Sequence, residues 1–332
     1  MGNKLSLSRR ALLVAGGILG LGGSSFVYER WIKEKSRCFV ARNQSYGRDL
    51  ARTIQDGLLS VGFDPRSIRS KQVLLKPNLV EPTRAAPHMT THPAILSAAI
   101  EVFKNWGARI CVGEAPGHVR DSEMALRAAD IAHVLLDSQT RFADLNYEPT
   151  RWSENRGHAS KLKGFYFPQS VLEADLIVSM PKLKTHHWMG VTASLKNMYG
   201  VIPGSRYGWP KNVLHFNGIP ETVVDINASL PPRVSIVDAI DCMEGDGPIM
   251  GSKKTMGLVA VGLDMVAVDA TLCRIMGMDP SKIPYLQLVD QGVNRLSDWS
   301  IEQVGESWQS LQTPFEILKR PELQAMRLSL VT

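Results

Sequence analysis

The segment at residues 173–204, EADLIVSMPKLKTHHWMGVTASLKNMYGVIPG, constrains the fold of this chain more than any other. Its apolar run at 176–180 is typical of a buried strand, and Pro181 ends that run. Lysines, histidines and glycines then follow within a few residues. Open α/β sheets build their binding sites in this way, at the carboxyl ends of their strands. The segment therefore predicts one wall of a binding or catalytic pocket.

The rest of the chain alternates between strand-like and helix-like patterns. Strands are expected at 37–42, 73–76, 109–112, 234–237 and 258–261, and helices at 47–61, 93–106, 217–229 and 265–276. This alternation predicts an α/β fold with a mostly parallel sheet and helices on both of its faces. We expect a cleft at the strand carboxyl ends. The two halves, 36–150 and 151–332, are expected to form two closely associated lobes of one unit.

Composition limits the classes of function. The chain has 332 residues, 44% of them apolar, which is enough for a large hydrophobic core. The net charge is +6, but the first thirty residues contribute +3 of it, from Lys4, Arg9, Arg10 and Arg30 against Glu29. The remaining +3 is too small to indicate a nucleic-acid partner, and no basic run alternates with aromatic residues.

The N-terminus indicates export. Arg9 and Arg10 precede a glycine-rich apolar run at 11–27, which is typical of a twin-arginine signal. A plain N-terminal membrane anchor is the alternative, because no clear cleavage site follows the run. Both interpretations place the chain outside the cytoplasm, in the periplasm or on the outer face of the inner membrane. We therefore expect a signal or anchor with a linker at 1–35 and a single α/β unit at 36–332.

The cysteines do not indicate a metal cluster. Cys38, Cys111, Cys242 and Cys273 are scattered without paired spacing. Iron–sulfur clusters and structural zinc sites need clustered thiolates, so we expect no iron–sulfur cluster within this chain. Three of the four cysteines lie in apolar patterns, which favours buried free thiols over disulfides.

Polar residues recur where the expected strands end, and in a parallel sheet these ends converge on one edge. Lysines opposite carboxylates suit a small anionic or phosphorylated ligand held near a divalent metal. The catalytic candidates are Lys182, His186 and Lys196; the ligand-binding candidates are Lys76, Asn78, Gly190, Asn197 and Gly204; and the metal-binding candidates are Glu114, Asp238, Glu244 and Asp246.

Each of these assignments has a simpler alternative. A lone lysine is usually a solvated surface charge, and Lys184 is expected to be one. His186 and His187 point in different directions on regular structure, so we expect one of them to act as a base or metal ligand. The acids of the 238–246 region are equally compatible with a solvated loop. Asp264 fits a helix cap as well as a ligand.

Several stretches of the chain resemble the domain of unknown function family 362. They lie at 73–82, 91–117, 174–204, 214–226, 236–251 and 262–280. The resemblance implies no settled reaction. Many members of that family carry an appended ferredoxin-type domain, which this chain lacks. A fainter resemblance, His186-x3-Gly190-x5-Lys196, is to the N-terminal domain of the nickel-dependent lactate racemases, which move hydride at a 2-hydroxy acid.

These observations lead to one preferred function and two alternatives. The preferred one is an exported α/β enzyme that binds a small anionic or phosphorylated ligand with a metal or cofactor. The first alternative, suggested by the family resemblance, is a non-catalytic envelope protein that serves an iron–sulfur redox partner. The second is a racemase-like hydride-transfer enzyme.

Overall fold

The computed structural model describes residues 35–81, 84–292 and 294–329. The signal or anchor expected at 1–35 falls, except for its last residue, outside these residues. Ser36–Thr332 form one compact unit. Its strands are β1 (Ser36–Ala41), β2 (Gln72–Pro77), β3 (Arg109–Glu114), β4 (Arg141–Asp144), β5 (Thr150–Glu154), β6 (Gly164–Pro168), β7 (Leu176–Met180), β8 (Lys182–His186), β9 (Gly190–Thr192), β10 (Arg233–Glu244), β11 (Ser252–Gly262) and β12 (Ile301–Gly305).

Helices connect and cover these strands. The α-helices are α3 (Leu50–Ser60), α4 (Pro93–Asn105), α5 (Ser122–Ala128), α6 (Ile131–Asp137), α7 (Gln169–Leu172), α8 (Ser194–Asn197), α9 (Gly204–Tyr207), α10 (Asn212–Phe216), α11 (Ile219–Ala228), α12 (Met265–Ile275), α13 (Pro284–Asp290), α14 (Trp308–Leu311) and α15 (Pro321–Gln324). The 3₁₀ turns include η2 (Pro87–Met89) and η3 (Met198–Val201). Within the described residues, no helix is long and apolar enough to cross a membrane.

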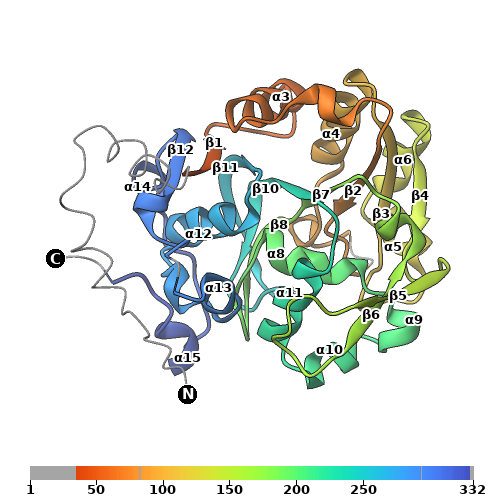
Figure 1. The fold of residues 1–332 in the computed structure, drawn as a ribbon. Helices are drawn as coiled ribbons and strands as arrows, with labels where there is room; N and C mark the ends of the chain where they lie inside the picture. Colours follow the sequence, from red (N-terminus) through yellow and green to blue (C-terminus); the bar gives the residue numbers. More distant parts are fainter. Residues whose placement is uncertain (1–34, 82–83, 293, 330–332) are drawn as a thin grey trace, which may run out of the picture. The chain divides into compact units, whose positions relative to one another are not determined.

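One large sheet runs through the unit in the order β12-β1-β11-β10-β7-β2-β3-β4, with β8 and β9 attached beside β10 (Figure 1). Neighbouring strands are parallel except in the pairs β1–β11, β10–β11 and β8–β9. The predicted α/β fold with a mostly parallel sheet is therefore confirmed. The two halves of the chain share this sheet, because β1 lies between β11 and β12.

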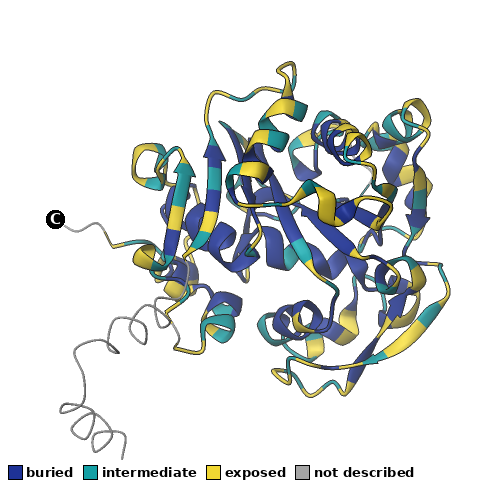
Figure 2. Cartoon of the chain, turned by 45° about the horizontal axis from the view of Figure 1, so that its top comes forward, coloured by how far each residue is buried: buried dark blue, intermediate teal, exposed yellow. Residues whose placement is uncertain are grey.

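The central strands are buried on both faces, which explains their continuous apolar runs. Side chains alternate across the sheet, so Leu74 of β2 belongs to one core while Val73 and Leu75 belong to the other. Helices α3 and α4 cover the core that contains Val73 and Leu75. Helices α8, α11, α12 and α13 cover the core that contains Leu74. Figure 2 shows the buried sheet enclosed between helices whose outer faces are exposed.

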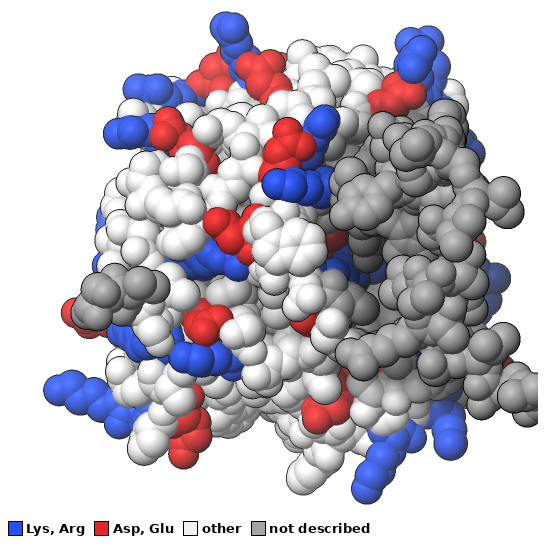
Figure 3. Space-filling model, turned by 60° about the vertical axis from the view of Figure 1, so that its left-hand side comes forward, with Lys and Arg blue, Asp and Glu red and all other residues white. Residues whose placement is uncertain are grey.

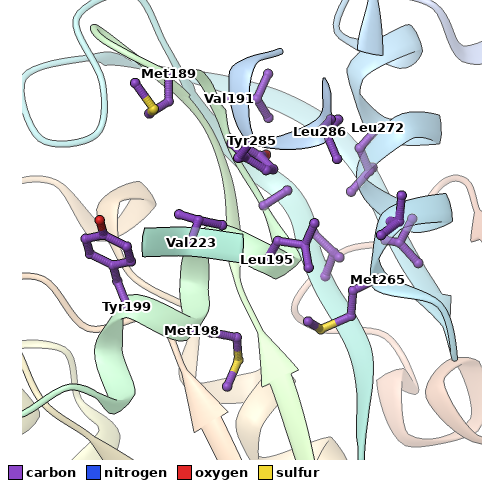
Figure 4. Packing of buried hydrophobic residues seen from close by; sticks show 14 of the residues in the cluster. Met189, Val191, Leu195, Met198, Tyr199, Val223, Met265, Leu272, Tyr285 and Leu286 are labelled. Atoms are coloured by element: carbon purple, nitrogen blue, oxygen red, sulfur yellow. The ribbon is translucent and has the colours of Figure 1, made fainter. Parts of the chain in front are cut away.

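Helix α12 is the most enclosed helix, since all of its residues are buried. Figure 4 shows Met265 and Leu272 of α12 in the same packed cluster as Leu195 of α8 and Tyr285 of α13. The helix begins at Asp264, whose side chain accepts a hydrogen bond from the backbone N–H of Val266. Asp264 is thus a helix cap, one of its two expected roles.

The structure corrects the expected end of one strand. The strand predicted at 234–237 continues past Asp238 to Glu244, with a register shift between Ala239 and Asp241. It then pairs with β11 as an antiparallel hairpin. The prediction that Asp238 lies at a strand end is therefore wrong. The helix expected at 217–229 starts later, at Ile219.

The order of the strands determines where a ligand site can form. From β2 the chain moves outward to β3 and β4, and it then returns to β7 and β10 on the other side of β2. Such a reversal leaves a crevice at the carboxyl ends of the two central strands, where open α/β sheets bind ligands. The hairpin of β8 and β9 follows β7 directly at this edge.

Candidate functional site

A cavity of about 330 Å³ lies at the carboxyl ends of β2 and β3, beside β8 and α8. Asn78 follows β2, Glu114 ends β3, and Lys184 and His186 belong to β8. The polar and aromatic side chains that line the cavity are Asn78, Glu114, His118, Lys184, His186, His187, Trp188, Thr192, Lys196, Asn197, Tyr199, Lys211, Asn212 and His215. The cavity therefore occupies the crevice that the strand order predicts.

Three lysines line the cavity with little compensating negative charge. Lys184 and Lys211 are buried, and Lys196 is half-buried. Lys184 donates one hydrogen bond, to the carbonyl of Met89 (2.8 Å). Lys211 donates two, to the carbonyls of Ala115 and Tyr199, each at 2.8 Å. Within the described residues, neither of these two lysines forms an ion pair with a carboxylate.

Burial lowers the pKa of all three lysines. The pKa of Lys211 falls to about 7 and that of Lys196 to about 8, in both cases mainly through loss of hydration. The pKa of Lys184 falls well below its usual value, through burial and then through the neighbouring lysines. Strong pKa shifts of this kind concentrate at functional sites, because holding like charges together out of water costs stability.

The only acidic side chain in the lining, within the described residues, is Glu114. It pairs with Lys76, which also donates to the carbonyl of Pro77 (2.7 Å) and to Oδ1 of Asn197 (3.2 Å). Burial raises the pKa of Glu114 to about 7, and the nearby lysines oppose that rise. Gly200 packs against this pair so closely that a Cβ there would collide with both charged groups. Lys76 and Glu114 thus form a buried ion pair beneath the cavity, in which each charge compensates the other.

Helix α8 carries Lys196 and Asn197 into the site, and a buried carboxylate fixes where it starts. Asp269 of α12 accepts hydrogen bonds from the backbone N–H groups of Ser194 (2.7 Å) and Leu195 (3.0 Å). The first N–H groups of a helix have no partner within the helix, so this contact satisfies two of them. Asn197 in turn donates to the carbonyl of Lys76 (3.1 Å), which connects α8 to β2.

His186 is held with one ring nitrogen turned towards the backbone. Its Nδ1 accepts from the N–H groups of Trp188 (3.1 Å) and Met189 (3.4 Å). This contact assigns the proton of the neutral ring to Nε2. Burial, and then Lys196, lowers the pKa of His186 well below its usual value. A neutral ring with its proton on Nε2 donates a hydrogen bond, which disfavours the expected role of base or metal ligand.

His118 and His215 also line the cavity. Burial lowers the pKa of His118, and it lowers that of His215 to about 4, with Lys196 as the next cause for His215. The ring of His215 faces that of Tyr199 with centroids 6.3 Å apart. Lys196 Nζ lies 3.9 Å from the centroid of the same tyrosine ring. Tyr199 therefore contacts both a lysine and a histidine of the lining.

Two polar atoms of the lining lack partners. Within the described residues, Oδ1 of Asn78 and Oγ1 of Thr192 are buried without a hydrogen bond. Buried polar groups are almost always paired, because an unsatisfied one costs about 1–3 kcal/mol. These atoms join the unused N–H donors of the lysines as contacts that a ligand can complete.

The mouth of the cavity is more apolar. Trp188 is 51% exposed and packs edge-on against the ring of His187, with centroids 4.5 Å apart. Pro248 and Ile249, from the loop between β10 and β11, also line the cavity. A ligand held by the lysines can thus place a less polar portion against Trp188.

Lys182 belongs to a different cluster. Its Nζ contacts Oδ2 of Asp238 (2.6 Å) and the hydroxyl of Tyr46 (2.9 Å). Asp238 also accepts from the backbone N–H of His92 (2.9 Å). Lys182 and Asp238 are both buried, and neither lines the cavity. The pair joins β8 to β10 outside the cavity.

The four carboxylates proposed as metal ligands are not brought together. Glu114 pairs with Lys76, Asp238 with Lys182, Glu244 with Lys254 (2.9 Å) and Asp246 with His187 (3.3 Å). Within the described residues, no group of three or more His, Cys, Asp or Glu side chains is arranged to hold a metal ion. The donor set in the cavity, rich in N–H groups and poor in free oxygens, fits an anion better than a cation.

The two candidate glycines also have structural roles. Gly190 has a φ of +76° in the turn between β8 and β9, a conformation that favours glycine. Gly204 packs against the ring of Trp209, and its N–H donates to Oδ1 of Asn146 (2.7 Å). Neither glycine is among the residues that line the cavity.

The structure thus gathers part of the predicted set and adds residues that the sequence did not single out. Asn78, Glu114, His186, Lys196 and Asn197 line the cavity, with Lys76 behind them. Lys184, expected at the surface, is fully buried in the lining. The residues outside that set are Lys211, His118, Trp188, Tyr199 and His215.

Known proteins resemble this chain over most of its length. It is 29% identical over 259 residues to the thylakoid-associated protein sll1697 of Synechocystis sp., covering 74% of this chain and 76% of that protein. A structure of the lactate racemase apoprotein from Thermoanaerobacterium thermosaccharolyticum aligns with a TM-score of 0.45 at 16% identity. That alignment covers 74% of this chain and 57% of the racemase chain. Residues 73–274, more than half of the chain, match a family described as a domain of unknown function, and the chain belongs to that family, DUF362.

Proposed function

We propose that the cavity binds a small, multiply charged anion, either phosphorylated or carboxylated, and that this site carries the activity of the protein. One observation supports the proposal above all others. An ammonium group has three N–H donors. Within the described residues, Lys184 uses one of them, Lys211 two and Lys196 none in hydrogen bonds to the protein.

The free-energy cost of burying unpaired lysines favours a cavity that is occupied by an anion. Burying an ammonium without a partner costs several kcal/mol, so unpaired buried lysines are rare unless they serve a ligand. An oxyanion would accept the unused N–H groups and would restore the pKa values of the lysines. Charge-assisted hydrogen bonds of this type are about twice as strong as neutral ones. Elsewhere on the surface, the face in Figure 3 shows basic and acidic side chains interspersed.

Titration calorimetry with inorganic pyrophosphate and with a dicarboxylate tests the proposal. Lys184→Met and Lys211→Met each remove donors, and we expect each to weaken binding by about tenfold to a hundredfold, the worth of one or two charge-assisted hydrogen bonds. Lys71→Met is the matched control, because Lys71 is exposed and contacts only Asp175 (3.6 Å). If both cavity variants bind as tightly as the Lys71 variant, the assignment of the site is wrong.

We also propose that the protein is exported by the twin-arginine route and works outside the cytoplasm. The support is the pair Arg9-Arg10 before the apolar run at 11–27. The name of the relative from Synechocystis sp., a thylakoid-associated protein, is compatible with a site of action at a membrane.

A further inference from the structure

Lys196 differs from the other lysines around the cavity in having no hydrogen-bond acceptor within the described residues. Lys76, Lys184 and Lys211 each donate to backbone carbonyls, which hold their ammonium groups in place. Lys196 contacts only the face of Tyr199, at 3.9 Å from the ring centroid. It is also half-buried, while the other three are buried. Within the described residues, its amine therefore has all of its hydrogen-bonding positions open to a ligand in the cavity.

The surroundings of Lys196 increase the fraction of its amine that is neutral. Burial lowers its pKa to about 8, and the positive charge of Lys76 contributes to the shift. Lys184, Lys211, His186, His215 and His118 also surround it, and the charge on Lys196 lowers their pKa values in turn. Desolvation beside other cations is the usual way in which proteins prepare a lysine for attack on a carbonyl group.

We propose that Lys196 forms an imine with an aldehyde or ketone that also carries a phosphate or carboxylate group. In this arrangement Lys184 and Lys211 bind the anionic group of the ligand, and the unpartnered amine of Lys196 attacks its carbonyl carbon. This inference rests on the proposed anion site and adds to it the chemical class of the ligand.

The reaction is balanced without any further reactant. The lone pair of the neutral amine attacks the carbonyl carbon, a C–N bond forms, and the carbonyl oxygen takes up a proton. The nitrogen then loses its second proton as the hydroxyl group leaves as water, which completes the C=N bond. The nitrogen gives up two protons and the carbonyl oxygen takes up two, so water leaves and no net proton is gained or lost.

Borohydride trapping tests the inference on the full chain. Pyridoxal 5′-phosphate serves as the probe, because it joins an aldehyde to a phosphate, and peptide mass spectrometry locates the reduced adduct. At about pH 7.5 we expect Lys196 to be labelled at least about tenfold more than exposed lysines such as Lys71, since a larger share of its amine is unprotonated. Excess inorganic pyrophosphate should prevent the labelling, and pyridoxal without phosphate should label Lys196 less.

Two variants complete the experiment. Lys196→Arg keeps the positive charge but cannot form an imine, so the adduct should disappear while pyrophosphate still binds. Lys71→Arg should leave the labelling of Lys196 unchanged. If the Lys196 variant does not fold, the distribution of label over the lysines of the unmodified chain still decides the matter.

The outcomes separate the two proposals. Label spread over surface lysines, or concentrated on Lys184 or Lys211, overturns the imine at Lys196. If pyrophosphate binds in that case, the anion site stands by itself. If pyrophosphate does not bind either, both proposals fail.

Discussion

At the scale of single residues, β8 contains a natural comparison. Lys182 and Lys184 are two residues apart on the same strand, and both are buried. Lys182 pairs with Asp238 at 2.6 Å, while Lys184 Nζ, among the described residues, donates only to a backbone carbonyl. The same side chain at the same depth thus serves to stabilise the fold in one case and, as we propose, to bind a ligand in the other.

Replacing each lysine by methionine should change stability in different ways. Lys182→Met leaves Asp238 buried without its partner, and we expect the free energy of unfolding to fall by about 3–5 kcal/mol. Lys184→Met removes an unpaired buried cation, so we expect that energy to rise or to change by less than about 1 kcal/mol. Urea denaturation without added anion measures both. Equal destabilisation by the two substitutions would show that Lys184 is structural.

Anion binding should take up protons. In the free protein the pKa values of Lys196 and Lys211 are lowered to about 8 and about 7, and that of Glu114 is raised to about 7. A bound anion stabilises the protonated form of each group and so raises all three pKa values. At a pH between the pKa of the free protein and that of the complex, a group gains a proton on binding. The affinity for the anion therefore falls as the pH rises above about 7.

Calorimetry in two buffers with different ionisation enthalpies counts these protons. Proton uptake between about pH 7 and 9 should be smaller in Lys211→Met, because one of the titrating groups is missing. Binding without proton uptake, or affinity that increases with pH, would contradict the assigned protonation states.

At the scale of elements, the site depends on how closely η3 approaches β2 and β3. Gly200 allows this approach, because any side chain there would occupy the space of the Lys76–Glu114 pair. We expect Gly200→Ala to lower the free energy of unfolding by about 1–3 kcal/mol, as overpacking usually does, and to weaken pyrophosphate binding. Gly47→Ala is the control, since Gly47 has no neighbouring atom within 4 Å of the added Cβ.

A comparison of predicted and observed helices and strands shows which of them sequence patterns determine. The strands predicted at 73–76 and 109–112 and the helix at 93–106 lie within about a residue or two of the observed elements, because apolar periodic runs determine them. The strand predicted at 258–261 was too short, since β11 begins six residues earlier, at Ser252. Asp238 was misplaced, since nothing local distinguishes a strand end from a strand that continues into a hairpin. Only part of the site could be predicted, because the sequence indicates the ends of some strands and not of others. Residues next to strand ends, such as Asn78 and Glu114, could be inferred from the sequence.

Lys211 could not be predicted, because it lies in an irregular connection between α9 and α10. Its φ of 70° is uncommon for a residue other than glycine, and only tertiary contacts reveal its role. The sequence also does not show which carboxylate, if any, each lysine pairs with. Lys182 and Asp238 are 56 residues apart, and whether a lysine finds a carboxylate depends on strand register.

At the scale of the whole molecule, the cavity combines residues from distant parts of the chain. Asn78, Glu114, Lys184 and Lys211 come together only when β2, β3 and β8 are in place. Strands from both halves alternate in the sheet, with β1 between β11 and β12. The ligand site is therefore complete only in the folded unit. A route that exports folded proteins would allow the protein to bind its ligand before it leaves the cytoplasm.

Changing the paired arginines to lysines tests the export proposal. Arg9 and Arg10, both replaced by lysine, keep the basic charge of the N-terminus but remove the pair itself. We expect the protein to remain in the cytoplasm of a bacterium that has the twin-arginine system, as measured by cell fractionation and immunoblotting. Arg30→Lys is the control and should leave export unchanged, because Arg30 follows the apolar run. A double variant that reaches the periplasm, or the outer face of the membrane, as efficiently as the Arg30 variant would show that the arginine pair is not the signal. Since the charge is conserved in both variants, only recognition of the pair can separate them.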